Sequence, residues 1–318
     1  MDVKEELVKL CHKIGNRIPT WTQGQGGNAS LKENGKLWIK ASGERLDSVA
    51  ASRGLAVLDI NGFLAEIQPS PSISDENQYS KAIAETKDPS YGTPSMETGF
   101  HAVLPRRVVL HFHSLAAILM GHVMEHQETK WKSWISTHTK KSQICPVPLI
   151  CPGRKLMAAI GDLPRAEIYI LKNHGVILHS DSEGILDQWQ ALEIQFCEAF
   201  GYKTLKALLE STHPWSDATA QVKEIHSKEL KLYFPDAAVF KPQLNLHLAK
   251  NRSIGDPAIL AERAERNLDE ILCATVLLNL LEPKLQEISP ELALEIRGMP
   301  LEKERIQKIS RNSESGNK

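Results

Sequence analysis

The apolar residues of this chain form short runs that alternate with polar turn segments over about the first 180 residues, the pattern of a mixed α/β fold. Residues 3–16 place apolar side chains at helical spacing and predict an amphipathic helix. Residues 37–40, 55–60, 107–113 and 166–178 are rich in apolar and β-branched residues. We therefore expect buried strands there, with a turn inside the last segment.

Two Asn-Gly pairs indicate tight turns between strands. The pair at 34–35 precedes the strand 37–40, and the pair at 61–62 separates 55–60 from 63–67. Both pairs predict β-hairpins, so the N-terminal part of the chain should form antiparallel sheet.

A glycine-rich loop at residues 22–30 leads into the first hairpin. A dinucleotide-binding loop needs a strand before it and a helix after it, whereas strands follow here, so we do not expect NAD binding. Two interpretations are left. Backbone N–H groups freed by Gly26 and Gly27 bind an anion, or the segment is a plain hairpin loop.

Three histidines lie where strands end or turn. His111 and His113 share one face of the strand 107–113, about 7 Å apart, while Phe112 points into the core. His174 lies in the turn within 166–178 and is followed by a glycine. Packed or solvated histidines are the alternative, but three imidazoles with an open position are a recurrent ligand set of catalytic zinc.

The segment between the second predicted hairpin and the histidines contains a loop and a helix start. Residues 68–93 show no period and predict a surface loop with a short helix near 78–86. Ser95 is expected to cap a helix in which Glu97 lies in the first turn and His101 one turn later. A first-turn carboxylate by itself indicates only a favourable contact with the helix dipole.

The C-terminal third of the chain has a different pattern of charged and apolar residues. Residues 182–209 predict one long amphipathic helix. From residue 213 the chain consists of charged helical segments, to which the pattern assigns no chemistry, and a polar end expected to fray. The predicted segments are 214–232, 233–248, 256–281 and 291–311, and the polar end is 312–318.

Composition narrows the possible partners. With 318 residues, 42% of them apolar, the chain can bury one large core and still supply a second unit. The formal net charge of −1 favours neither nucleic acid nor an anionic membrane. The five cysteines include no Cys-x-x-Cys pair, which argues against a disulfide framework and a thiolate zinc site. No signal peptide or membrane-length apolar run is visible, so we expect a cytoplasmic protein.

Six short motifs follow one another along the chain: Gly-Gly-Asn-Ala-Ser (26–30), Lys-Ala-Ser-Gly (40–43), Pro-Ser-Met-Glu-Thr (94–98), His-Phe-His (111–113), Pro-Gly (152–153) and Lys-Asn-His-Gly (172–175). In this order they resemble the class II aldolase/adducin family over about residues 5–210. The likeness is greatest to the aldolase part of rhamnulose-phosphate aldolase/short-chain dehydrogenase fusion proteins. It implies a three-layer α/β/α fold with a central, mainly antiparallel sheet and a homo-oligomer, a tetramer by resemblance. We expect a catalytic domain at 1–212 and a mostly helical extension at 213–318.

The resemblance also implies roles for individual residues. His111, His113 and His174 match ligands of Zn²⁺ or another divalent metal, and Glu97 matches the catalytic acid/base. Met96 departs from a second serine of the smaller fuculose-phosphate enzymes, which removes one expected phosphate contact. The positions that match phosphate-binding residues are Gly27, Asn28, Ser42, Gly43 and Ser95.

Together these features predict a metal-dependent aldolase that cleaves a small hydroxy-ketose, a sugar phosphate, through a metal-stabilised enediolate. A ribulose-phosphate-type 4-epimerase or a sugar-phosphate dehydratase would need the same metal and a similar base. A non-catalytic, adducin-like interaction module is the alternative from another class, and it would lack the metal histidines.

Overall fold

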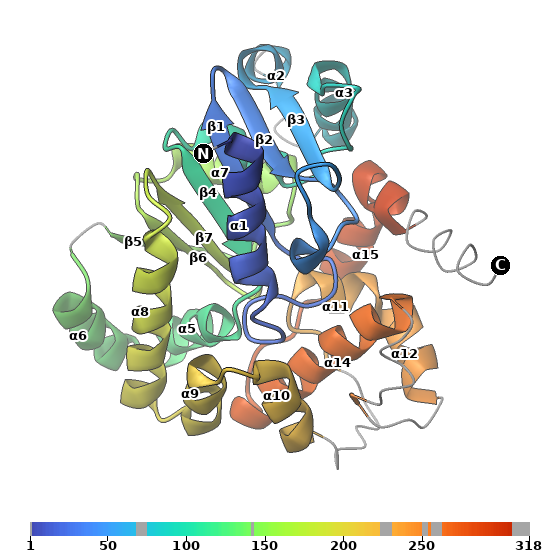
Figure 1. Ribbon diagram of the computed structural model, residues 1–318. Coiled ribbons are helices and arrows are strands. Elements are labelled where there is room, and N and C mark those ends of the chain that lie inside the picture. Colours follow the sequence, from blue (N-terminus) through green and yellow to red (C-terminus); the bar gives the residue numbers. More distant parts are fainter. Residues whose placement is uncertain are drawn as a thin grey trace.

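The computed structural model describes residues 2–67, 75–140, 143–222, 231–249, 254–255 and 263–306. These residues contain a seven-stranded sheet in the order β3-β2-β1-β4-β7-β6-β5, in which only β5 and β6 run parallel (Figure 1). The predicted mainly antiparallel sheet is confirmed. The strands are β1 (Asn28–Glu33), β2 (Lys36–Lys40), β3 (Leu55–Asp59), β4 (Val108–Phe112), β5 (Ile144–Val147), β6 (Ile168–Leu171) and β7 (Gly175–Ser180).

Helices cover both faces of the sheet, because its strands bury side chains on both sides. Along β4, Val108, Leu110 and Phe112 face one hydrophobic cluster, and Val109 faces another. The two covering layers confirm the three-layer α/β/α fold (Figure 1). One layer contains α1 (Val3–Gly15), α5 (Leu115–His126) and α8 (Ile185–Phe200), and the other contains α2 (Ile60–Ile67), α3 (Glu76–Thr86), α4 (Thr98–Val103) and α7 (Arg154–Asp162).

The two Asn-Gly pairs adopt different structures. Both residues at 34–35 have positive φ, 52° and 76°, and link β1 to β2 as expected. The pair at 61–62 lies inside α2, so the prediction of a second hairpin is wrong. Asp59 accepts a hydrogen bond of 3.1 Å from the backbone N–H two residues on, and Phe63 and Ile67 are buried one helical turn apart. The side-chain cap and the helical spacing of these apolar residues outweigh the local turn signal.

The long helix predicted over 182–209 is interrupted. It forms α8 and, after a break, α9 (Lys203–Glu210). Gly201 ends α8 in the left-handed region with φ of 84°, a common way for a helix to stop. Apolar residues continue at helical spacing from α8 into α9. The spacing alone therefore did not reveal the break.

The segment before the histidine strand also differs from expectation. Helix α4 begins at Thr98 and Glu97 occupies its N-cap, so Ser95 is not the cap residue. The Ser95 hydroxyl instead accepts a hydrogen bond of 3.3 Å from the Glu97 N–H. The short helix predicted near 78–86 is α3, and residues 68–74 of the predicted loop lie outside the described residues.

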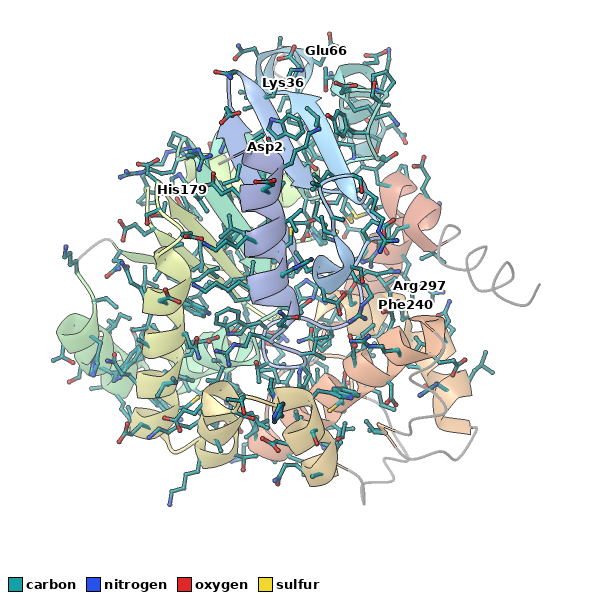
Figure 2. The ribbon with its side chains drawn as sticks, viewed as in Figure 1. Asp2, Lys36, Glu66, His179, Phe240 and Arg297 are labelled. Carbon is teal, nitrogen blue, oxygen red and sulfur yellow. The ribbon has the colours of Figure 1, made fainter. Side chains whose placement is uncertain are left out.

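After residue 212 the described chain is mostly helical, as expected. Helix α14 packs against α5, α10 and α12, and its buried side chains join the same hydrophobic cluster as α1. Phe240 and Arg297 mark this part of the molecule in Figure 2. The helices are α10 (Pro214–Val222), α11 (Pro235–Val239), α12 (Lys241–Ala249), α14 (Arg263–Leu281) and α15 (Pro290–Gly298), followed by helical residues 300–306.

Some predicted helical positions cannot be compared with the structure. Residues 223–230, 256–262 and 307–318, which include the end expected to fray, lie outside the described residues. None of the helices in the described ranges combines the length and apolar character that crossing a membrane requires.

Candidate active site

A cleft of ≈ 520 Å³, measured with its open mouth, lies beside the carboxyl end of β4, the β6–β7 turn and the start of α4. It brings together nearly all the residues singled out from the sequence. His111 lies buried behind this lining, in contact with Glu97. The predicted residues that line the cleft are Gly27, Asn28, Ser42, Gly43, Ser95, Glu97, His113 and His174.

The three histidines form a compact buried cluster. His111, His113 and His174 each offer a ring nitrogen, and these nitrogens lie within 4.8 Å of one another. Nδ1 of His111 is 2.9 Å from the carbonyl oxygen of Val176. An N–H on Nδ1 therefore leaves the Nε2 lone pair of His111 facing the cluster. The two strands predicted to carry the histidines lie next to each other in the sheet, which is why the rings meet.

Backbone geometry at the β6–β7 turn places His174. Asn173 has φ of 53° and Gly175 has φ of 142°. A Cβ at Gly175 would lie 2.2 Å from the carbonyl oxygen of Phe112. Only glycine lets this turn approach the end of β4 so closely. The Asn173 amide also donates to the carbonyl of Gln286 at 2.5 Å, so the C-terminal extension holds the turn from the other side.

Glu97 lies against two of the histidines. Its Oε1 is 3.1 Å from Nε2 of His174 and 3.3 Å from Nε2 of His111, and its Oε2 accepts a hydrogen bond of 2.9 Å from Asn28. Burial would raise the pKa of Glu97, but the two imidazoles beside it hold that pKa well below its usual range. The carboxylate is therefore anionic and fixed in place by Asn28, which pairs with His111 across β1 and β4.

The residues present fit a divalent metal ion. Nε2 of His111 is buried and has no hydrogen-bond partner among the described residues, an arrangement that proteins avoid unless another group satisfies the atom. Burial lowers the pKa of His174 to about 4, whereas Glu97 raises the pKa of His111 against the effect of burial. A metal ion would displace any proton on the coordinating nitrogens, because only the neutral imidazole is a ligand. Three imidazoles beside a carboxylate are a donor set that suits zinc.

The expected phosphate-binding positions all line the cleft. Gly27 and Gly43 have positive φ, 81° and 76°. The N–H of Gly26, expected to be free for an anion, instead donates to the carbonyl of Gln23 at 3.0 Å. The N–H of Ser42 donates to the carbonyl of Thr93 at 2.8 Å. The N–H of Ser42 is therefore already paired within the chain.

Four charged cleft residues were not assigned from the sequence: Lys40, Asp236, Glu302 and Arg305. The Lys40 ammonium donates to the carbonyls of Gln25 (3.0 Å) and Glu44 (2.7 Å), and burial lowers the pKa of Lys40 to about 8. Lys40 is the first residue of the Lys-Ala-Ser-Gly motif (40–43), whose serine and glycine also line the cleft. Its place in this motif could have indicated that it lies in the site. The other three come from the extension, where no spacing pattern links them to the histidines.

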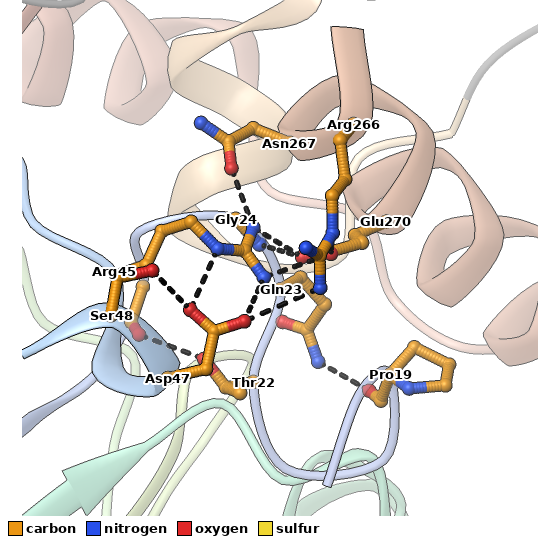
Figure 3. Close-up of polar contacts among 11 residues, drawn as sticks. Pro19, Thr22, Gln23, Gly24, Arg45, Asp47, Ser48, Arg266, Asn267 and Glu270 are labelled. Carbon is orange, nitrogen blue, oxygen red and sulfur yellow. Dashed lines mark hydrogen bonds and ion pairs between the residues drawn. The ribbon is translucent and has the colours of Figure 1, made fainter. Parts of the chain in front are cut away.

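The glycine loop is tied to the extension by a buried ionic network (Figure 3). The N–H of Gly24 donates to Oε2 of Glu270 in α14 at 2.8 Å. Arg45 donates to the same carboxylate at 2.9 Å and to Asp47 at 2.8 Å, and Arg266 also bonds Glu270, at 2.9 Å. These paired charges fix the loop that forms one wall of the cleft.

The layered sheet and the buried cluster of three histidines with one glutamate define a protein of the class II aldolase type. This chain belongs to the family described as class II aldolase and adducin N-terminal domain, whose model matches residues 5–182. The predicted family is confirmed. The N-terminal class II aldolase domain of a conserved protein from Thermoplasma acidophilum has the same fold, with a TM-score of 0.50, 21% identity, and coverage of 64% of this chain and 94% of that one.

Relatives of known sequence cover only part of the chain. The uncharacterized oxidoreductase YuxG of Bacillus subtilis (strain 168) is 26% identical over 211 residues, 62% of this chain and 29% of that protein. Methylthioribulose-1-phosphate dehydratase of Pectobacterium carotovorum subsp. carotovorum (strain PC1) is 31% identical over 123 residues, 37% of this chain and 47% of that protein. The chain thus matches less than half the length of each of these two relatives.

Proposed function

We propose that this chain is a divalent-metal-dependent lyase that cleaves or forms a carbon–carbon bond in a small phosphorylated hydroxy-ketose. The supporting observation is the burial of three imidazoles and Glu97 together, with His113, His174 and Glu97 lining a cleft beside a glycine loop. Zinc is the metal we propose, from the ligand types. A non-catalytic interaction module would give no reason to bury ring nitrogens without partners, which is costly to the fold.

The catalytic residues would come from residues 1–212, and the extension would complete the cleft. A metal bound by the histidines supplies Lewis-acid stabilisation of the charge that develops on the substrate oxygens. Glu97, anionic and held by Asn28, is placed to move a proton to or from the reacting carbon. Donors that line the same cleft would hold the phosphate: the glycine loop at Gly27 and Asn28, the turn at Gly43, and the hydroxyls of Ser42 and Ser95.

Dehydration of a ketose phosphate is the second candidate. It is favoured by the 31% identity over 123 residues to methylthioribulose-1-phosphate dehydratase of Pectobacterium carotovorum subsp. carotovorum (strain PC1). Elimination of water also needs a carbonyl polarised by a metal and a base near the adjacent carbon, so the same residues would serve.

Elemental analysis and a substrate panel test the proposal together. We expect one divalent metal per chain, lost in His111→Ala, His113→Ala and His174→Ala because two ligands hold an ion too weakly. His122→Gln, a histidine outside the cluster, should keep its metal. Ketose 1-phosphates should then yield an aldehyde product for an aldolase or a dehydrated ketone for a dehydratase. Full metal content in all three alanine variants would refute the metal site.

A further inference from the structure

The extension places a buried carboxylate against one of the candidate metal ligands. Asp236 lies in the first turn of α11, is 3% exposed, and its Oδ2 is 3.4 Å from Nδ1 of His113. Within the described chain, neither of these two atoms has a hydrogen-bond partner. A Cβ on Gly26 would lie 2.5 Å from that Oδ2 and 2.8 Å from that Nδ1. The glycine loop therefore leaves space for Asp236 and His113 to meet.

The other oxygen of Asp236, Oδ1, is held by an arginine. Arg305 donates to Oδ1 of Asp236 at 2.7 Å and also pairs with Glu302 at 2.7 Å. Its guanidinium lies 5.4 Å from the centre of the Phe240 ring. One arginine thus faces two buried carboxylates. A buried carboxylate oxygen is costly unless a positive or donating group faces it, and the His113 ring is the group that faces Oδ2 of Asp236.

We propose that Asp236 is a positioning residue for His113. Resting on the proposed function, in which the histidines hold a metal, Asp236 accepts the Nδ1–H of His113 and turns its Nε2 into the cluster, so that metal affinity depends on the extension. Carboxylate partners of metal-binding histidines fix the tautomer and ring orientation, and their loss typically weakens metal binding by about 10- to 100-fold. Arg305 fixes the carboxylate in turn.

Direct metal ligation by Asp236 is the competing arrangement. Among the described residues, the cluster of donor atoms within 4.8 Å of one another contains only the three histidines. Asp236 instead lies on the Nδ1 side of His113, facing the ring edge. The geometry favours positioning over ligation.

Zinc titration of the full chain against a chromophoric chelator measures the effect. We expect Asp236→Asn to bind zinc about 10- to 100-fold more weakly than the wild type. The control is Asp269→Asn, which removes another buried carboxylate of the extension, bonded to His247 and to the N–H of Gly255. This control should lose stability but keep its zinc affinity. Near-UV circular dichroism at low temperature measures the folded fraction of each variant. Each zinc titration is corrected for that fraction.

Cobalt substitution adds a readout that a merely structural role would not move. A positioning role predicts that cobalt-loaded Asp236→Asn keeps the coordination number of the wild type, seen in the intensity of the visible absorption bands, with weaker binding. Unchanged zinc affinity in Asp236→Asn, an equal loss in Asp269→Asn, or a changed coordination number would each overturn the proposal. A wild-type protein that binds no stoichiometric metal would instead refute the proposed function itself.

Discussion

Replacing Gly175 by alanine should damage both the fold and the histidine cluster. Gly175 has φ of 142°, and an added Cβ would lie 2.2 Å from the carbonyl oxygen of Phe112 and 2.8 Å from Cα of His113. The conformation alone costs an alanine about 1–3 kcal/mol. The clash involves backbone atoms, which cannot swing aside as a side chain can. We therefore expect a total loss of about 3–5 kcal/mol in the free energy of unfolding.

The shift that relieves this clash must separate the β6–β7 turn from β4, so His174 should move away from His111. Urea unfolding measures the first effect and zinc titration the second, for which we expect at least about tenfold weaker binding. Gly161→Ala is the matched control, because this glycine lies inside helix α7 and, apart from its chain neighbours and the backbone of its own helix, no described atom lies within 4 Å of the place its Cβ would take. That control should be slightly stabilising, by about 0.5–1 kcal/mol. A Gly175→Ala protein as stable as the wild type, with full zinc affinity, would show that this close approach is unnecessary.

Three other expectations concern single side chains. Glu97→Gln should keep its metal and lower turnover by about 10²-fold or more, since a positioned acid/base is lost; wild-type turnover would place proton transfer elsewhere. The unphosphorylated ketose should have at least about 10²-fold lower kcat/KM than its phosphate ester, and Ser42→Ala should narrow that gap; equal effects on both substrates would refute phosphate binding there. Burial raises the pKa of Glu193 from 4.5 to about 8, although Ser114 and Trp21 donate to it. Because the folded state binds this proton more tightly, stability should fall as pH rises from about 4.5 to about 8, by a few kcal/mol. Glu193→Gln should abolish that fall in urea unfolding, and an identical pH profile in both proteins would contradict the reasoning.

Local signals in the sequence predicted the residues that meet through neighbouring strands. The alternation along β4 placed His111 on one face and Phe112 on the other, and Phe112 is fully buried against Trp21. The Asn-Gly pair at 34–35 forms the predicted turn, and it joins two strands that pair antiparallel on either side of it. The pair at 61–62 did not, because Asp59 caps a helix there, and a side-chain cap of this kind is not visible in the hydrophobic period.

Contacts between distant segments could not be predicted in the same way. Asp236 of α11 lies beside His113, and Arg305 of residues 300–306 pairs with Asp236. No periodicity of these two segments indicates a place in the cleft. The same holds for Glu270, whose bond to Gly24 spans 246 positions in the chain. Such side chains look like ordinary solvated charges until tertiary packing buries them.

The bond between Gly24 and Glu270 also bears on the order of events during synthesis. The strands of the sheet end at Ser180, so a growing chain can assemble the sheet before α14 leaves the ribosome. The glycine loop, although among the first residues made, has to wait for Glu270 before the N–H of Gly24 is paired and before Arg45, already bonded to Asp47, gains its second carboxylate. The nascent chain would therefore have a folded sheet while its substrate pocket is still incomplete. Substrate binding would begin only after α14 packs against the glycine loop.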